Sequence, residues 1–202
     1  MVETQIEGRQ ITNPAVLRAM RRVPRHAFVP TSLWGQAYRD GPLPIGHGQT
    51  ISQPYIVAYM TDALSVHCGH KVLEVGCGSG YQAAVLADMG VEVHSVEIIP
   101  DLEKLASQTL AQLGYPVHTH IADGTFGWPD GAPYDGIIVT AAPQIVPGLL
   151  LEQLRENGRL VIPVGPIFNQ QLNVFQKRAG QLTLKDTLAV RFVPMTGKIQ
   201  EH

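Results

Sequence analysis

A glycine-rich turn between a short apolar run and a helix-forming stretch constrains this chain most. Residues 72–75 read Val-Leu-Glu-Val, the turn carries Gly76, Gly78 and Gly80, and residues 81–89 are rich in alanine and leucine. Strand, glycine turn and helix in this order open a βαβ nucleotide-binding unit, in which glycine lets the main chain approach a ligand closely. The Gly-x-Gly-x-x-Gly spacing used for a dinucleotide pyrophosphate is missing, which disfavours a nicotinamide dehydrogenase.

Acidic residues follow the next two apolar runs. The run Val91–Val96 is followed by Glu97, about 20 residues past the glycines, where a carboxylate accepts both hydroxyls of a ribose. The run Val117–Ile121 is followed by Asp123 and Gly124, a pair suitable for an adenine amino group. A tight turn before a packed helix would explain the glycines alone. Together with the two acids, they predict a pocket for an adenosyl group, and S-adenosylmethionine fits it better than NAD.

Strand-like and helix-like stretches alternate from residue 72 onward. Further strands are expected at residues 134–140, 159–164, 171–177 and 187–192. Helices are expected from Pro14 up to Val23, and at residues 55–64, 81–89, 101–113 and 147–154. Continuous apolar strands separated by helices predict the α/β class, with a doubly wound, mainly parallel sheet and helices on both faces. The last two strands have no helix between them, so we expect an antiparallel edge at the C-terminal end.

The chain length is enough for one domain, residues 1–202, and too short for two ordinary ones. Residues 1–65 are expected to supply N-terminal helices and a long loop, and residues 66–202 the cofactor-binding sheet. Prolines and glycines punctuate residues 26–50, which show little regular periodicity. Loops of this length inside a compact domain are usually functional, so this segment is the candidate to fold over the ligand crevice.

Helix ends can be predicted from capping residues. Asn13 is expected to cap the first helix, and Asn157-Gly158 to end the helix at residues 147–154. Ser52 and Pro54 suit the start of the helix at residues 55–64. Taken alone, Thr50 and Ser52 are explained better as helix caps than as functional residues.

Composition excludes several classes of protein. A net charge of -2 without a basic stripe gives no electrostatic case for nucleic acid as the main partner. No charged-then-apolar stretch opens the chain, and no apolar run reaches the roughly 18 residues of a membrane span. The two cysteines, Cys68 and Cys77, provide no disulfide framework, so a reducing cytosol is expected. No long amphipathic seam is left over, so a monomer is expected.

The histidines do not predict a metal site. Eight are present, but they are scattered along the chain. His118 and His120 alternate on one expected strand, and His67 and His70 flank a loop. Neither pair has partners at ligand spacing, so no metal is expected.

Several motifs resemble those of the protein-L-isoaspartate (D-aspartate) O-methyltransferases over nearly the whole chain. The most specific is the segment from Pro44 to Pro54, which is similar to that family's signature loop and is called the signature loop below. Further matches are Val23-Pro24-Arg25, Phe28-Val29-Pro30, Ala37-Tyr38 with Asp40, Ala132-Pro133-Tyr134-Asp135, Ala141-Ala142-Pro143, Leu160 to Gly165 and Arg191-Phe192-Val193-Pro194. Cys77 and Ala122 depart from the residues that many relatives carry, but both remain small.

The resemblance implies transfer of a methyl group from S-adenosylmethionine to the α-carboxylate of L-isoaspartyl, and in the family also D-aspartyl, residues. S-adenosylhomocysteine is then the second product. Such residues arise in aged proteins, and the methyl ester drives succinimide formation, which returns part of the damage to normal aspartate. Isoaspartyl-containing peptides and aged proteins are thus the implied partners, and the cytoplasm is the implied location.

The resemblance also implies roles for individual residues. Ser52 is the expected active-site residue, held beside the cofactor by the signature loop. The implied cofactor-binding residues are Gln49, Thr50, Ile51, Ser52, Gly76, Gly78, Ser79, Gly80, Glu97, Asp123, Gly124 and Thr196.

Two alternatives remain open at this stage. The same fold and cofactor could serve a different methyl acceptor, although the signature loop argues against this. A non-catalytic module could retain the adenosyl pocket as a scaffold, although intact Ser52, Glu97 and Asp123 disfavour it. Cofactor binding without turnover would identify such a module.

Overall fold

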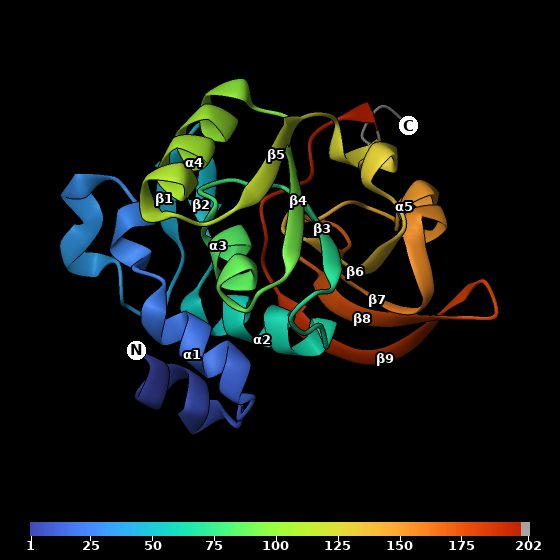
Figure 1. Ribbon diagram of the computed structural model, residues 1–202, viewed down its shortest axis with the longest axis horizontal. Helices are drawn as coiled ribbons and strands as arrows, with labels where there is room; N and C mark the ends of the chain where they lie inside the picture. The colour runs from blue at the N-terminus through green and yellow to red at the C-terminus, as the bar shows by residue number, and fades with distance from the viewer. Residues whose placement is uncertain (199–202) are drawn as a thin grey trace.

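Residues 1–198, which the computed structural model describes, contain a seven-stranded sheet in the order β5-β4-β3-β6-β7-β8-β9 (Figure 1). The strands are β3 (Lys71–Val75), β4 (Glu92–Glu97), β5 (Val117–Ile121), β6 (Tyr134–Val139), β7 (Leu154–Val164), β8 (Gln170–Arg178) and β9 (Gln181–Val190). The strands from β5 across to β7 pair in parallel, and β8 and β9 add antiparallel pairings at one edge. The predicted α/β class with an antiparallel C-terminal edge is confirmed.

Helices cover both faces of this sheet (Figure 1). They are α1 (Pro14–Arg22), α2 (Pro54–Leu64), α3 (Tyr81–Asp88), α4 (Pro100–Leu113) and α5 (Gly148–Gln153). On one face, Met60 of α2 and Leu86 of α3 are buried with Val93 of β4. On the other face, Leu150 of α5 is buried with Leu73 of β3. Within residues 1–198, no helix combines the length and the apolar character needed to cross a membrane.

The path of the chain across the sheet reverses at β3. From β3 the chain steps outward to β4 and β5, and it then returns to β6 on the other side of β3. At such a switch point the connections after neighbouring strands leave in opposite directions, and a crevice opens at their carboxyl ends. Gly76 directly follows β3, Glu97 ends β4 and Thr140 directly follows β6, so all three meet at this crevice.

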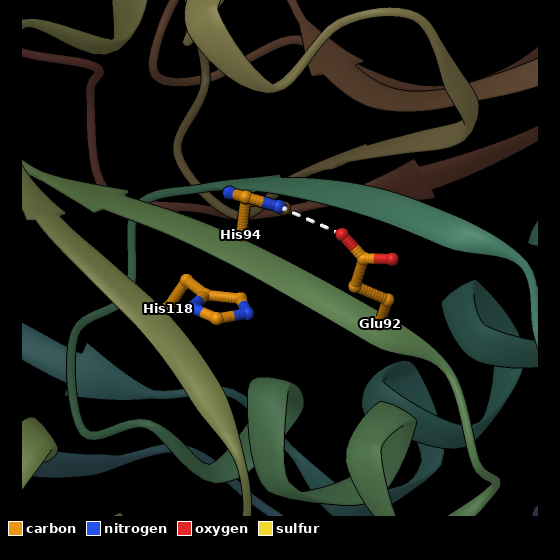
Figure 2. Close-up of side chains that lie close together, drawn as sticks. All are labelled: Glu92, His94 and His118. Atoms are coloured by element: carbon orange, nitrogen blue, oxygen red, sulfur yellow. Dashed lines mark hydrogen bonds and ion pairs between the residues drawn. The ribbon is translucent and has the colours of Figure 1, made fainter.

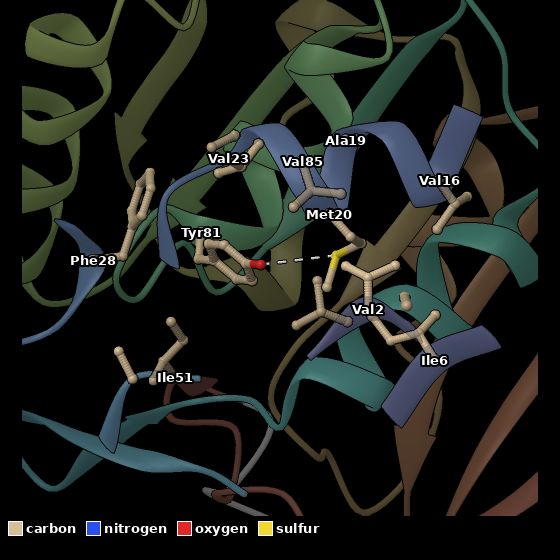
Figure 3. Close-up of a cluster of buried hydrophobic side chains, with 14 of the residues drawn as sticks. Val2, Ile6, Val16, Ala19, Met20, Val23, Phe28, Ile51, Tyr81 and Val85 are labelled. Atoms are coloured by element: carbon tan, nitrogen blue, oxygen red, sulfur yellow. Dashed lines mark hydrogen bonds between the residues drawn. The ribbon is translucent and has the colours of Figure 1, made fainter. Parts of the chain in front are cut away.

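The N-terminal segment forms a buried cluster against α3 (Figure 3). A π-helical turn at Val2–Ile6 and short 3-10 helices at Glu7–Arg9, Arg25–Phe28 and Thr31–Gln36 accompany α1. Ile6 and Met20 are buried in this cluster with Tyr81, the first residue of α3. The Tyr81 ring packs edge-on against Phe28, with 5.5 Å between ring centroids. The N-terminal segment therefore supports the helix that leaves the glycine turn.

Part of the expected irregular loop at residues 26–50 is a β-hairpin. Strand β1 (Leu43–Gly46) pairs antiparallel with β2 (Gln49–Ile51). His47 and Gly48 join the strands with positive φ of 51° and 70°, which matches the backbone of a tight hairpin turn. The segment was not predicted as strand because it is short and contains Pro44, a residue that disfavours sheet pairing.

The helix ends are partly as expected. Asn13 caps α1, and its side chain accepts the N–H of Ala15 at 3.0 Å, as predicted. The helix expected at residues 147–154 is present as α5, but the prediction that Asn157-Gly158 ends it was wrong, because the helix ends at Gln153 and this pair lies within β7. Asn157 has a φ of 67° beside a break in the β6–β7 register, so the turn-like pair marks a bulge rather than a helix end.

Two further boundaries bear on the site. β9 starts at Gln181, directly after a turn in which Ala179 and Gly180 have positive φ, and not at residue 187 as expected.

The N-cap of α2 is Gln53, and no side chain makes a cap hydrogen bond there. The capping explanation of Ser52 is therefore wrong, and its hydroxyl makes no hydrogen bond within residues 1–198.

Candidate functional site

A cavity lies at the carboxyl ends of β3, β4 and β6, where the switch point predicts a ligand crevice. The glycine turn, the end of β4, the signature loop and the segment after β9 enclose it. Its lining consists of Gln49, Thr50, Ile51, Ser52, Val57, Glu74, Val75, Gly76, Cys77, Gly78, Ser79, Tyr81, Gln82, Val96, Glu97, Ile98, Ile99, Gly124, Thr140, Ala141, Val193, Pro194, Met195 and Thr196.

The glycine turn passes close to the end of β6. Gly76 has a φ of 94°, and a β-carbon at this position would lie 2.6 Å from the Thr140 hydroxyl oxygen. Only glycine therefore fits between the two strand ends. The Gly76 and Cys77 N–H groups both donate to the Val96 carbonyl, at 2.9 and 3.1 Å, which ties the turn to β4.

The carboxylate of Glu97 sits at the centre of the cavity wall. Its side chain is buried, with 6% of the residue exposed. Oε2 accepts the N–H of Gly78 at 2.8 Å, and Oε1 accepts the N–H of Ile99 at 3.0 Å. Each carboxylate oxygen has a second acceptor position, so Glu97 can still accept two hydroxyl groups from a ligand.

A second carboxyl group, that of Glu74, lies in the same cavity. The residue is fully buried within β3, and Ser95 on β4 donates a hydrogen bond to its Oε2. Oε1 has no partner within residues 1–198. Burial, with the neighbouring charge of Glu97 as a smaller contribution, raises the pKa of Glu74 to about 8. Glu74 is thus protonated at neutral pH in the absence of a cationic ligand.

The neighbouring thiol of Cys77 is also kept neutral. Burial, followed by the charges of Glu74 and Glu97, raises its pKa well above the ordinary value. A thiol with a raised pKa is a poor nucleophile. Cys77 therefore acts as a small apolar residue in the turn.

A buried arginine anchors the segment that leads into the signature loop. The Arg25 guanidinium donates to the Ala37 carbonyl at 2.8 Å and lies 5.0 Å from the centroid of the Tyr81 ring. At the other end, the Gln53 side chain donates to Asp40 at 2.8 Å. Between these anchors, Ile45 lies close enough to meet a β-carbon built on Gly78 at 3.5 Å. The loop thus contacts the glycine turn directly.

A second cavity adjoins the first. It is lined by Pro42, Thr50, Ser52, Gln53, Ile56, Thr140, Ala189, Val190, Arg191, Phe192 and Val193. Thr50, Ser52 and Thr140 line both cavities. In the described part of the chain, Arg191 is the charged residue of this lining. The residues that the two cavities share therefore include three with hydroxyl side chains, and the lining of the second cavity adds the cation Arg191.

The structure brings most of the sequence-predicted residues together. The first cavity is lined by the predicted residues Gln49, Thr50, Ile51, Ser52, Gly76, Gly78, Ser79, Glu97, Gly124 and Thr196. Thr196 reaches it because the segment after β9 pairs with Ala142, whose carbonyl accepts the Met195 N–H at 2.9 Å.

Gly80 and Asp123 are outside this lining. A β-carbon on Gly80 would lie 3.2 Å from Leu110 of α4, so this glycine allows two helices to approach. Asp123 accepts the N–H groups of Thr125 at 2.9 Å and Lys198 at 3.0 Å. Although burial opposes it, these hydrogen bonds hold the pKa of Asp123 below its usual value.

Sequence reasoning assigned no role to several polar residues of the cavity lining, including Glu74, Gln82 and Thr140. A signal for Glu74 was available, since a carboxylate within an apolar strand is unusual unless it has a partner. Thr140 follows an apolar strand in the same way that Glu97 does. Its hydroxyl donates to the Val75 carbonyl at 3.1 Å and joins the ends of β3 and β6.

Comparisons with known proteins agree with this geometry. The family model described as "Protein-L-isoaspartate(D-aspartate) O-methyltransferase (PCMT)" matches residues 1–200. The chain belongs to this family. The resemblance seen in the sequence is confirmed, and with it the class of enzyme: a methyltransferase that uses S-adenosylmethionine and acts on isoaspartyl-containing proteins.

Relatives and solved structures of the family are similar along the whole chain. A protein-L-isoaspartate O-methyltransferase of Gloeobacter violaceus is 53% identical over 205 residues, which cover 100% of both chains. One of Opitutus terrae is 56% identical over 97% of this chain and 85% of its own. A solved protein-L-isoaspartate O-methyltransferase has a TM-score of 0.86 at 29% identity; the match covers 98% of this chain and 66% of that one.

A second solved structure is described with a ligand. It is a putative enzyme of this family from Plasmodium falciparum in complex with S-adenosyl-L-homocysteine. Its TM-score is 0.82 at 25% identity, and the match covers 96% of both chains.

The raised pKa of Glu74 predicts a pH-dependent loss of stability. Between pH 4.5, the ordinary pKa, and about 8, the folded chain retains this proton and the unfolded chain does not. Unfolding then releases a proton, so the free energy of unfolding falls as pH rises through this window. Glu74→Gln should remove this part of the slope in denaturant titrations without ligand. An unchanged slope would contradict the assignment; Glu152→Gln, on the surface of α5, controls for the loss of one carboxylate.

Proposed function

We propose that this chain methylates the α-carboxylate of L-isoaspartyl residues in damaged proteins and thereby initiates their repair. The observation that carries this proposal is the pair of adjoining cavities. One contains the buried acids Glu74 and Glu97, and the other contains Arg191. A cationic methyl donor suits the first cavity and an anionic acceptor suits the second. They adjoin at Ser52, where transfer between the two ligands would occur.

The first cavity fits S-adenosylmethionine. Within residues 1–198 its lining contains two carboxyl groups and no basic side chain, which suits a cation and disfavours a ligand with phosphates. We assign the ribose hydroxyls to Glu97. The Oε1 atom of Glu74 is buried and has no hydrogen-bond partner within residues 1–198. An ammonium group of the ligand would donate a hydrogen bond to it, which is favourable because a buried polar atom without a partner costs free energy.

The remaining cofactor contacts are assigned by position. We assign the main chain of the turn, Gly76, Gly78 and Ser79, to close approach of the ligand, while Gly80 supports the turn by helix packing. The lining from Gln49 to Ser52, together with Gly124 and Thr196, would cover the ligand. Asp123 lies behind Gly124, and its carboxylate retains acceptor positions for an adenine amino group.

The acceptor needs orientation more than activation. A carboxylate with a pKa of about 4 is already ionised at pH 7, so no general base is required. The cofactor, when bound, supplies an electrophilic methyl group. The chain then has to hold the carboxylate in line with that group, which proximity and orientation can accelerate greatly. This agrees with the neutral Cys77 thiol and with the absence of a Ser-His-Asp group from the described lining.

Ser52 is the residue that we assign to orientation. The residue lines both cavities, and its hydroxyl is free to donate, since it makes no hydrogen bond within residues 1–198. A hydroxyl that donates to the acceptor carboxylate would fix one oxygen and leave the other to attack. Ser52 would therefore act as a hydrogen-bond donor and not as a nucleophile.

Isoaspartyl-containing peptides and aged proteins are the proposed partners. The net charge of -2 gives no support for nucleic acid, and we expect no membrane partner. Cys68 and Cys77 are both free thiols, which supports a reducing cytosol as the location. A monomer acting on exposed segments of damaged proteins is the simplest working form.

The proposed acceptor can be tested with matched peptides. An L-isoaspartyl peptide and its normal-aspartyl twin are incubated with the enzyme and radiolabelled S-adenosylmethionine. Base-labile methyl ester is expected on the isoaspartyl peptide alone. Transfer to neither peptide, with cofactor binding intact in calorimetry, would contradict the acceptor while leaving the fold and the cofactor pocket in place.

Ser52→Ala should lower kcat/KM for an isoaspartyl peptide by about 10- to 100-fold, because a hydrogen bond to a charged group contributes about 1.5–3 kcal/mol. Cofactor affinity should stay nearly unchanged. Ser107→Ala on α4 is the matched control, since that hydroxyl bonds only its own helix, at the Lys104 carbonyl. Turnover by Ser52→Ala equal to that of the control would remove Ser52 from the active site.

Glu97→Gln should weaken S-adenosylmethionine binding by about 1–3 kcal/mol, because charge-assisted hydrogen bonds to the ligand are lost. Isothermal titration calorimetry measures this directly, with Glu152→Gln as the control. Thermal unfolding without ligand separates this effect from damage to the glycine turn, whose Gly78 N–H also depends on Glu97. Equal affinity of the two variants would place the ribose elsewhere.

A further inference from the structure

We propose that Glu92, His94 and His118 form a binding site for a divalent transition-metal ion, with Zn²⁺ as the best match. The site lies on the outer part of the sheet, where β4 pairs with the edge strand β5. It does not depend on the proposed methyl transfer.

Strand pairing brings the three side chains together. Glu92 and His94 are two residues apart on β4, so they point to the same face of the sheet. His118 is the direct partner of His94 in the parallel β4–β5 register. The three ligand atoms lie within 4.8 Å of one another. Figure 2 shows the His94 ring aimed at the Glu92 carboxylate, with the His118 ring beside them on the neighbouring strand.

The distances are close to those of a bound ion. The Nε2 of His94 and Oε1 of Glu92 are 3.2 Å apart. In a tetrahedral zinc site with bonds of about 2.1 Å, neighbouring ligand atoms are about 3.4 Å apart. The ring of His118 has to approach the other two ligands to bind the same ion. His118 is exposed, so its ring can rotate. Glu92 is 49% exposed and can rotate as well.

The donor set selects a class of metal. Two imidazoles and one carboxylate suit Zn²⁺ and its neighbours Co²⁺, Ni²⁺ and Cu²⁺, whereas Mg²⁺ and Ca²⁺ prefer oxygen ligands alone. Three protein ligands leave a fourth position for water. The three ligands belong to two paired strands of the sheet, so metal binding should cost little conformational entropy.

A further histidine supports the orientation of His94. The Nδ1 of His94 lies 3.3 Å from the Nε2 of His120. His120 in turn stacks on the indole of Trp128, with 3.9 Å between ring centroids. An imidazole that binds a metal commonly donates its other N–H to such an outer partner, which fixes its tautomer. If Nδ1 of His94 donates to His120, its Nε2 is left with a lone pair for the ion.

The ammonium group of Lys71 would compete with a metal ion for the Glu92 carboxylate. The Lys71 ammonium lies 3.8 Å from Oε1 of Glu92 and also donates to the Gly131 carbonyl at 3.1 Å. The ion pair is partly exposed, so its contribution to stability is small and a divalent ion can replace it. Lys71 keeps its carbonyl partner after the exchange.

The site is separate from the cofactor cavity. Glu92 and His94 point to the face of β4 opposite to that of Ser95 and Glu97, because side chains alternate along a strand. None of the three ligands lines either cavity. A bound ion would cross-link β4 to β5, which is the outermost strand of the sheet. We therefore expect it to stabilise the fold and not to take part in catalysis.

The experiment is a zinc titration of the full chain, prepared without a polyhistidine tag and treated with a chelator. Calorimetry should show about one Zn²⁺ bound per chain, and Zn²⁺ should raise Tm because it binds the folded state. Glu92→Gln and His118→Phe should each weaken binding more than the roughly 10- to 100-fold that loss of an outer partner costs. His120→Phe keeps a ring on Trp128 and should lose affinity within that range.

His70→Phe is the matched control. His67 and His70 form the other close histidine pair, with ring centroids 3.5 Å apart, beside the exposed Cys68. This variant should bind Zn²⁺ as the wild type does, and His118→Phe should retain the wild-type kcat/KM. The proposal is overturned if the wild type binds no Zn²⁺, if His118→Phe binds it with wild-type affinity, or if His70→Phe loses it.

Discussion

The buried carboxylate of Glu97 is the interaction on which the rest of the site depends. It accepts two main-chain N–H groups, from Gly78 in the glycine turn and from Ile99 beyond β4. A loop made of glycines has little intrinsic preference for one conformation, so it needs such an external acceptor to become a rigid ligand cradle. Glu97 thus stabilises the glycine turn even without a bound ligand. Each of these bonds leaves one further acceptor position on its carboxylate oxygen, and the residue lines the cavity.

The segment that precedes the signature loop is anchored in turn by Arg25. This guanidinium is fully buried, and burial lowers its pKa to about 10, so it still carries its charge at neutral pH. A buried charge is tolerated only with strong partners, which here are the Ala37 and Gly41 carbonyls and the Tyr81 ring. Tyr81 directly follows the glycine turn. Arg25 therefore adds a polar link between the N-terminal segment and the cofactor turn to the apolar packing of Phe28 and Met20 on Tyr81.

Much of this organisation could be predicted from local patterns. The strand at Val117–Ile121 and the Asn13 cap were predicted correctly, because apolar periodicity and capping are properties of neighbouring residues. The hairpin of β1 and β2 was not predicted, because its strands are short and one of them contains Pro44. The bulge at Asn157 was not predicted either, because pairing of β7 with the distant strand β6 overrides the local turn signal there. Glu74 was missed for a related reason: its acid becomes significant only when the sheet buries it beside Glu97. Asp123 is likewise outside the cavity lining, and its carboxylate accepts the N–H of the distant Lys198, a contact that local sequence does not reveal.

Strand β4 shows how one short segment can serve two kinds of chemistry. Ser95 and Glu97 lie on one face of the strand, where Glu97 lines the cofactor cavity, whereas Glu92 and His94 lie on the other face. Sequence spacing cannot reveal the second group, because its third member belongs to another strand and is brought there by the β4–β5 register. The β3–β4 register carries Glu97 to the cavity, and the β4–β5 register sets His94 beside His118. A shift of β4 by one residue against both neighbours would break both arrangements, because it would move each side chain to the opposite face.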